Sequence, residues 1–284
     1  MIYKKLDVTI LIMTQNEEEN VEFAIKSVIN NFEQVIVVDS FSTDRTTEIC
    51  KKYSKLEIYN NKFISFSEQR NWILNNCKIR NEIVFFLDAD EYVNWEFIQE
   101  LRNIIESNIP FDSIYLTPKY IFFETHLKYA YGHPKIRRIF KNSKLVFTGE
   151  GAREYANKEG ISLIMKTPFI HYDRKPISSW IDKHNKNSDR EVASYFRNNP
   201  IENSVIPIAL KIKMWIRNSI WNRLPLLLRP SLYFVYRYFI QLGFLDMRPG
   251  YIYCYLHAYW YQSIIDIKIL EAKSKKLKEF SKIF

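Results

Sequence analysis

Short runs of apolar and β-branched residues recur near the start of the chain and alternate with segments of helical character. The runs cover 8–13 (VTILIM), 34–38 (QVIVV), 56–59 (LEIY) and 83–87 (IVFFL). Such short, continuously apolar runs are typical of strands buried on both faces of a parallel sheet. Because parallel strands need right-handed crossovers, the pattern predicts an open α/β sheet that binds ligands at the carboxyl ends of its strands.

The segment after the first run predicts the first crossover helix. Asn16 can cap this helix, and Glu19 stands three residues later, as in a capping box. Apolar residues then repeat at helical spacing as far as Ile29. A second helix is expected after the polar loop 40–44, whose last residues can cap it, and a third helix over 67–76.

The second half of the chain has a different pattern. After a helix near 95–107, short aromatic strands around 113–116, 120–123 and 136–140 predict an antiparallel extension of the sheet. From Pro176 onward helical patterns dominate, and the chain ends in a basic segment. We therefore expect a first domain over 1–174 and a helical, basic and aromatic region over 175–284.

Charge and cysteine content bear on the binding partner and the cellular compartment of the protein. A formal charge of +9 favours an anionic partner, which could be a nucleotide diphosphate, an acidic membrane surface or nucleic acid, although ordinary solvated surface explains much of it equally well. Cys50, Cys77 and Cys254 form no zinc-ligand cluster, which indicates core residues in a reducing compartment. The run 8–13 is too short for a signal-peptide core, so we expect a cytoplasmic protein.

Three carboxylates follow directly after the fourth apolar run. Asp88, Asp90 and Glu91 would repel one another at a strand end unless a cation or solvent compensates their charges. A hard divalent ion such as Mg²⁺ or Mn²⁺ takes oxygen ligands and leaves positions open for phosphate oxygens. A bare Asp-x-Asp tripeptide is often a solvated turn, but at a buried strand end it favours a metal-diphosphate site.

Other polar residues are expected at the same edge of the sheet. Asp39 ends the second apolar run, where it could accept hydrogen bonds from a base or ribose, or simply close a turn. Thr14 and Asn16 follow the first run, and their backbone could also meet the base. Arg70 could pair with a phosphate or with Asp88, and a plain surface ion pair is nearly as good an explanation.

Several segments, taken together, resemble the inverting family 2 glycosyltransferases of GT-A fold. They are VTILIMTQNEEENVEFAIKSV, VIVVDSFSTDRTTEIC, SEQRNWIL and FFLDADEYV, and two later segments extend the resemblance, PFIHYDRKPISSWIDKHNKNSDREVASY and YFIQLGFLDMRPGYIYCYLHAYWY. The chain is most similar to the bacterial lipopolysaccharide-core β-1,4-glucosyltransferases. The resemblance implies a GT-A (Rossmann-like) domain with a nucleotide-binding part over 1–93 and an acceptor part over 94–174.

The resemblance also implies roles for individual residues. Thr14 and Asp39 are expected to contact the uridine of a UDP-sugar, and Arg70 to lie near the nucleotide. Asp88 is expected to face the ribose or the metal, and Asp90 to bind the metal. These roles agree with the positions expected from the strand pattern.

An inverting transfer also needs a general base. A base must take the proton of the acceptor hydroxyl while the diphosphate departs. Glu154 is the candidate, although a glutamate paired with Arg153 fits equally well, and Asp173 or Glu150 are alternatives. The family commonly has a histidine where Arg153 stands.

Two further positions are compared with the family pattern. His171 matches a histidine of the resembling subgroup, where it could complete the metal shell or touch a phosphate, or could be a structural histidine. Phe41 stands where a glycine is usual, so the loop around it is expected to differ in shape.

The stretch 215–245 interleaves arginines with aromatic residues and leucines, and two prolines interrupt it. It contains no apolar run of the roughly 20 residues that a spanning helix needs. Such a pattern suits a helical surface at an anionic bilayer, where a lipid-linked acceptor would lie, and equally a helical subdomain that packs its aromatics inward.

We therefore expect an inverting, metal-dependent transferase that moves a sugar from a UDP-sugar, UDP-glucose by resemblance, to a lipopolysaccharide-core or other glycolipid or glycan acceptor. Transfer to a polyprenyl phosphate or a protein is an alternative. A sugar nucleotidyltransferase would need a glycine-rich, lysine-containing loop, whereas the corresponding segment TQNEEEN is acidic. A nucleic-acid binder leaves the acidic cluster after the fourth run unexplained.

Overall fold

The computed structural model describes residues 4–143, 145–149, 155–157, 160–197 and 221–280. The chain divides into two compact units. The first comprises Met1–His126 and His133–Lys175, and the second comprises Leu127–Gly132 and Pro176–Phe284. Each unit is described by itself.

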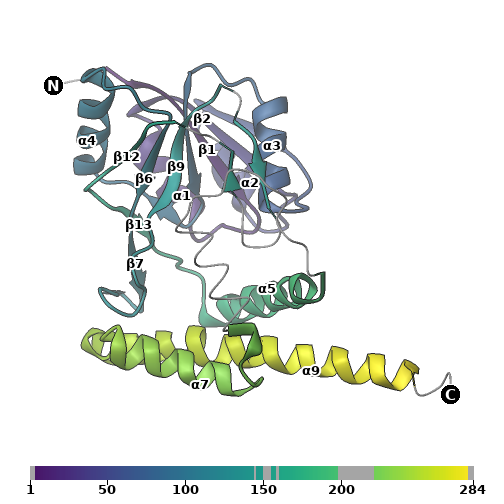
Figure 1. Ribbon diagram of the computed structural model, residues 1–284. Coiled ribbons are helices and arrows are strands. Elements are labelled where there is room, and N and C mark those ends of the chain that lie inside the picture. The colour runs from purple at the N-terminus through teal and green to yellow at the C-terminus, as the bar shows by residue number, and fades with distance from the viewer. Residues whose placement is uncertain (1–3, 144, 150–154, 158–159, 198–220, 281–284) are drawn as a thin grey trace. The chain divides into compact units, whose positions relative to one another are not determined.

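A seven-stranded sheet forms the centre of the first unit (Figure 1), with strand order β12-β6-β9-β4-β1-β2-β3. The four strands β4, β1, β2 and β3 run parallel to one another, as the apolar runs predict. β9 is antiparallel to both β4 and β6, which provides the expected antiparallel extension. The bounds are β1 Leu6–Thr14, β2 Phe32–Asp39, β3 Leu56–Asn60, β4 Ile83–Asp88, β6 Ser113–Leu116, β9 Ile136–Lys141 and β12 Ser162–Ile164.

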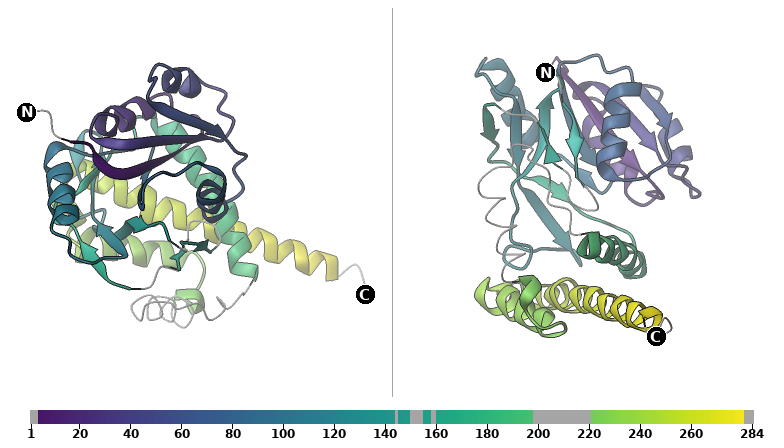
Figure 2. Two further views of the ribbon diagram at one scale, coloured as in Figure 1. Left: turned by 90° about the horizontal axis from the view of Figure 1, so that it is seen from above. Right: turned by 45° about the vertical axis from the view of Figure 1, so that its right-hand side comes forward.

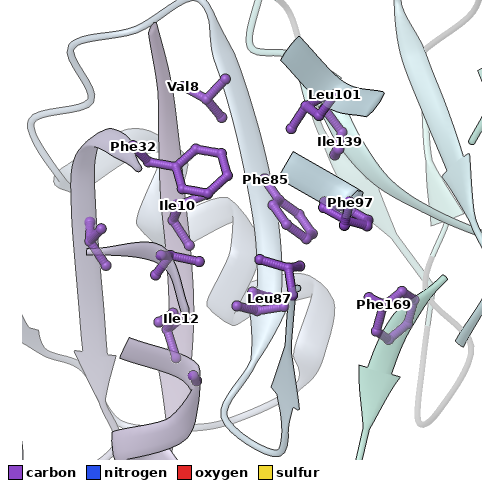
Figure 3. Packing of buried hydrophobic residues seen from close by; sticks show 14 of the residues in the cluster. Val8, Ile10, Ile12, Phe32, Phe85, Leu87, Phe97, Leu101, Ile139 and Phe169 are labelled. Carbon is purple, nitrogen blue, oxygen red and sulfur yellow. The ribbon is translucent and has the colours of Figure 1, made fainter. Parts of the chain in front are cut away.

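Alternate side chains of the sheet enter two separate apolar layers. Phe85 of β4 stacks on Phe97 of α4, with ring centroids 5.7 Å apart (Figure 3). The opposite layer contains Phe86 of β4 and Ile73 of α3. Since both faces are covered, the central strands have no polar alternation. The helices are α1 Val21–Val28 and α4 Trp95–Glu106 on the first layer, α3 Phe66–Asn76 on the second, and the short α2 Thr46–Lys51.

The first helix begins later than the sequence pattern predicts. α1 starts at Val21, so Asn16 does not cap it. Asn16 instead adopts a left-handed backbone, with φ of 55°, and its side-chain oxygen accepts a hydrogen bond from the N–H of Thr43. The expected capping box is therefore wrong, because the Asn16 side chain is used to hold the neighbouring loop.

A smaller sheet, of order β5-β13-β7-β8, brings distant segments beside the end of β4. The expected strand around 120–123 belongs to this sheet as β7, rather than to the extension of the large one. A two-stranded pair, β10 and β11, completes the strands. The bounds are β5 Glu91–Tyr92, β7 Pro118–Phe122, β8 Thr125–His126, β10 Phe147–Thr148, β11 Tyr155–Ala156 and β13 Phe169–His171.

The second unit is helical (Figure 2). Its segment 127–132 is held by Asp246, whose carboxylate accepts hydrogen bonds from the N–H groups of Lys128, Tyr129 and Ala130. Among the described helices, none is long and apolar enough to cross a membrane. The bounds are α5 Ile177–Arg197, η1 Trp221–Arg223, α7 Leu228–Val235, η2 Tyr236–Ile240, η3 Gly243–Asp246, α8 Met247–Tyr253, η4 Cys254–Trp260 and α9 Tyr261–Phe280.

Candidate functional site

The ends of three neighbouring strands place the predicted polar residues at one edge of the large sheet. Thr14 at the end of β1 is paired in register with Asp39 at the end of β2. On the other side of β1, Met13 is paired with Asp88 at the end of β4. The parallel register therefore brings Thr14, Asp39 and Asp88 together, as expected for carboxyl ends of adjacent parallel strands.

Asp39 closes the loop that follows β2. Its carboxylate accepts hydrogen bonds from the Thr14 hydroxyl at 3.0 Å and from the N–H of Ser42 at 2.8 Å, and the side chain is 1% exposed. These contacts are those of a turn aspartate. Phe41 in the same loop has a left-handed backbone with φ of 56°, so the loop keeps the conformation that a glycine adopts without strain.

Asp88 is held by two arginines. Arg138 of β9 donates to both carboxylate oxygens of Asp88, at 3.1 and 2.6 Å, and to Glu91 at 2.9 Å. Arg70 of α3 lies 3.8 Å from the Asp88 carboxylate, and its guanidinium sits over the ring of Phe86. Burial favours the protonated form of Asp88, but the two guanidinium groups outweigh it and hold the pKa of Asp88 well below its usual range.

Asp90, Glu91 and His171 form a group that could hold a metal ion. One ligand atom from each lies within 4.8 Å of the others. His171 belongs to β13, which pairs antiparallel with β5 so that His171 stands opposite Glu91. Its Nε2 is 3.5 Å from the Asp90 carboxylate, and its Nδ1 is 3.7 Å from that of Glu91.

Glu91 is the most enclosed member of this group, with 1% of its surface exposed. Burial raises the pKa of Glu91 to about 8; Arg138 opposes this shift, and Asp88 and Asp90 add to it. Both Glu91 oxygens already accept hydrogen bonds, one from Arg138 and the other from the N–H of Asp88. Glu91 therefore braces the strand end, while Asp90 and His171 are the better placed ligands.

A second polar network joins the end of β1 to the segment after β13. The amide of Asn20, fully buried, donates to Glu17 at 2.9 Å and to Asp173 at 2.8 Å, and it accepts from the N–H of Arg174. Lys175 pairs with Glu17 at 2.6 Å. Burial raises the pKa of Glu17, with Lys175 opposing the shift. Asn20 thus ties the chain just beyond His171 to the start of α1.

The Arg174 guanidinium is surrounded by aromatic rings in this network. It lies 3.6 Å from the ring centroid of Phe23, 4.3 Å from that of Tyr172 and 5.3 Å from that of Tyr92. Cation–π contacts of this kind hold a guanidinium in place. They fix the course of the chain just after β13.

Sequence reasoning missed several residues of the site. Arg138 was not anticipated, although an arginine inside the strand pattern Ile-Arg-Arg-Ile-Phe is a signal, because a charge on a buried strand face needs a partner. The Asn20 network left no such signal. Glu91 was grouped with the acidic cluster but not assigned to the metal. Glu154, the candidate base, lies outside the described residues, as do Arg153 and Glu150.

The open parallel sheet, with carboxylates gathered at its strand ends, defines an α/β domain of the nucleotide-binding class. The model of the family described as glycosyl transferase family 2 matches residues 9–159, which is more than half of the chain. The chain therefore belongs to glycosyl transferase family 2. The prediction of a family 2 glycosyltransferase is confirmed at this level.

Named relatives match parts of the chain. The SPbeta prophage-derived glycosyltransferase SunS of Bacillus subtilis is 30% identical over 161 residues, 55% of this chain and 37% of its own length. An uncharacterized glycosyltransferase of Rickettsia bellii is 33% identical over 100 residues, 35% of this chain and 33% of its own. The chain thus spans about a third of the length of these relatives.

Solved structures were compared with the chain as well. The mannosyltransferase PcManGT from Pyrobaculum calidifontis, in complex with GDP-Man and Mn²⁺, has a TM-score of 0.51 at 15% identity, with 94% of this chain and 88% of that chain covered. S. aureus TarS, residues 1–349, has a TM-score of 0.48 at 17% identity, covering 95% and 92%. The predicted GT-A-type α/β fold is confirmed.

Proposed function

We propose that the protein is an inverting, metal-dependent glycosyltransferase that uses a UDP-sugar donor. The observation that carries the proposal is the group of Asp90, Glu91 and His171, whose ligand atoms lie within 4.8 Å of one another at the end of β4. The Asp90 carboxylate and the His171 imidazole suit Mn²⁺ or Mg²⁺, and Glu91 braces the strand end beside them. Family membership and the PcManGT complex with GDP-Man and Mn²⁺ support a sugar-nucleotide donor held with a divalent ion, and the uridine is proposed from the family resemblance.

In this proposal Asp90 and His171 hold the divalent cation, which when bound would stabilise the negative charge of the departing diphosphate. Asp88 stays ionised because Arg138 and Arg70 pair with it, so it can accept a hydrogen bond from the donor ribose. Thr14 and Asp39 form the adjoining edge for the uridine, and Asn16 is held against the same loop by Ser42 and Thr43.

The acceptor side of the proposal rests on the family resemblance. A hydroxyl of a lipopolysaccharide-core or other glycolipid is the proposed acceptor, and glucose the proposed sugar. Glu154 is the proposed base. Glu154→Gln should cut turnover severely with donor binding little changed, and near-normal turnover would remove Glu154 from this role.

The metal and donor are tested together by following hydrolysis and thermal stabilisation with a panel of sugar nucleotides. With UDP-glucose we expect activity with Mn²⁺ or Mg²⁺ that chelation abolishes. Asp90→Asn should lower turnover roughly 100-fold or more, since a bound metal supplies several kcal/mol of transition-state stabilisation. Asp182→Asn, at an exposed position of α5, is the matched control and should leave turnover unchanged. Equal activity in both variants would reject the site.

A further inference from the structure

The second unit exposes many large apolar side chains within one stretch of sequence. Between Leu227 and Leu270 their exposed fractions reach 68% at Ile240 and 78% at Met247. Monomeric soluble proteins rarely expose contiguous apolar surface on this scale without a binding role. The exposed set is Leu227, Leu228, Leu232, Val235, Tyr236, Phe239, Ile240, Leu242, Phe244, Leu245, Met247, Tyr251, Tyr255, Tyr259, Ile267 and Leu270.

The helix formed by α7 and η2 buries charged residues and exposes apolar ones, the reverse of an ordinary surface helix. Leu228, Leu232 and Phe239 recur at helical spacing and are exposed. Arg229 and Arg237, on the same helix, are 3% and 9% exposed. Arg229 pairs with the buried carboxylate of Asp266, and Arg237 donates to the carbonyl of Ala130. The charged residues therefore face inward and the apolar residues face outward.

The neighbouring helix of α8 and η4 carries a matching exposed stripe. Met247, Tyr251, Tyr255 and Tyr259 follow one another at intervals of four residues and are all exposed. The two helices adjoin, because the ring of Tyr251 meets that of Phe234 at a centroid distance of 6.2 Å. Tyrosines with an apolar ring and a polar tip are enriched where apolar and wet surroundings meet.

The exposed charges between residues 221 and 260 are positive, and the nearest exposed carboxylate on α9 is Glu271, which pairs with Lys275. Between residues 221 and 260 the sequence has one carboxylate, Asp246. Asp246 is 6% exposed and is occupied by the N–H groups of segment 127–132. Arg223 and Arg248 are exposed. Lys273, further along α9, is also exposed.

We propose that this apolar face of the second unit, the exposed set named above, lies in the interface of an anionic phospholipid bilayer. The apolar side chains would enter the acyl boundary, the tyrosine stripe would sit at headgroup depth, and Arg223 and Arg248 would meet lipid phosphates. A second copy is a poorer occupant. Two-fold pairing sets the same patch against itself, so exposed arginines of both copies would enter one interface with no exposed carboxylate on 221–260 to compensate.

The proposal is independent of the transfer reaction, because binding is measured with vesicles alone. The full-length chain is centrifuged with phosphatidylcholine vesicles, with and without phosphatidylglycerol, at two salt concentrations. We expect binding to the anionic vesicles that weakens with salt. Replacing both Arg223 and Arg248 by Gln should weaken it about fivefold per arginine, with binding to neutral vesicles unaffected.

Two pairs of substitutions test the apolar face itself. Leu232→Gln with Phe239→Gln on one helix, and Met247→Gln with Tyr255→Gln on the other, should each lower vesicle binding roughly tenfold or more. The matched control is Ile109→Gln with Ile161→Gln, at first-unit positions that are 52% and 51% exposed. Because every replaced side chain is exposed, circular dichroism should show unchanged unfolding temperatures.

The proposal is overturned if the chain does not bind vesicles. It is also overturned if the control substitutions lower vesicle binding as much as the substitutions on the apolar face do. Light scattering provides the other refuting outcome. If the wild-type chain is a dimer, the two double variants of the apolar face are monomers, and none of them binds vesicles, then the apolar face joins two copies of the chain instead. If the wild-type chain binds vesicles but hydrolyses no UDP-sugar, the membrane proposal stands and the proposed function is rejected.

Discussion

Replacing Arg138 by methionine tests whether this arginine organises the acidic edge of the sheet. Arg138 is 7% exposed and makes hydrogen bonds to Asp88 and Glu91. Methionine keeps much of the volume of the side chain but removes the charge. In the Arg138→Met variant, three carboxylates at the end of β4 lose the cation that bridges two of them.

The magnitude of the loss follows from the burial of the two partners. Truncating one member of a buried ion pair costs about 3–5 kcal/mol. The Asp88 side chain is 31% exposed and keeps Arg70 at 3.8 Å, so solvent screening reduces the part of this cost that comes from Asp88. Glu91 is enclosed but keeps the N–H of Asp88. We expect a loss of about 2–4 kcal/mol, which lowers Tm by about 5–12 °C in a domain of this size.

The assay is thermal unfolding followed by circular dichroism without divalent ions. The matched control is Arg80→Met, because Arg80 pairs with Glu57 in the same unit but its side chain is 57% exposed. The control should cost less than about 1 kcal/mol. If the two variants unfold at the same temperature, Arg138 does not stabilise the edge in the way its contacts indicate.

Three further predictions concern single positions. Phe41→Gly should raise the free energy of unfolding by about 0.5–1 kcal/mol, because it relieves a left-handed backbone at a side chain that is 62% exposed; a lower Tm would contradict this. Burial lowers the pKa of His257 to about 3, and Arg237 acts in the same direction, so the folded chain does not bind the proton that the unfolded chain takes up below pH 6.5. The free energy of unfolding should therefore fall by about 1 kcal/mol between pH 7 and 5.5, and urea titrations should show a smaller fall in His257→Phe. Arg229→Met should cost about 3–5 kcal/mol because it leaves the buried Asp266 without its ion partner and with only the N–H of Leu227 beside it among the contacts described, and adding Asp266→Asn should recover part of that cost in the same titrations.

Much of the fold could be predicted from local pattern. Apolar runs buried on both faces indicate parallel strands, so the order of strand and helix through the end of β4 follows from the sequence. The start of α1 did not follow, because the residue that resembled a cap, Asn16, is used by another loop. The strand β7 was assigned to the wrong sheet, since a short aromatic strand carries no information about its partner.

Some residues of the candidate site could likewise be placed from the sequence, and others could not. Asp39 and Asp88 could be placed at one edge because parallel register follows from the strand order. His171 lies beside Asp90 because two-residue β5 pairs with β13, a contact between residues some eighty positions apart. Arg138 reaches Asp88 because β9 runs antiparallel beside β4 with its second arginine turned inward.

The sequence by itself determined the class of sheet, the strand that carries the acidic cluster and the excess of cations. These are properties of local periodicity and composition, which each segment carries with it. Tertiary structure decided which charges meet, and in the second unit it decided which side of each helix is buried. There the arginines turned inward to Asp266 and Ala130 and the leucines outward. Helical spacing alone cannot make that choice, because the partner of a buried charge comes from a distant part of the chain.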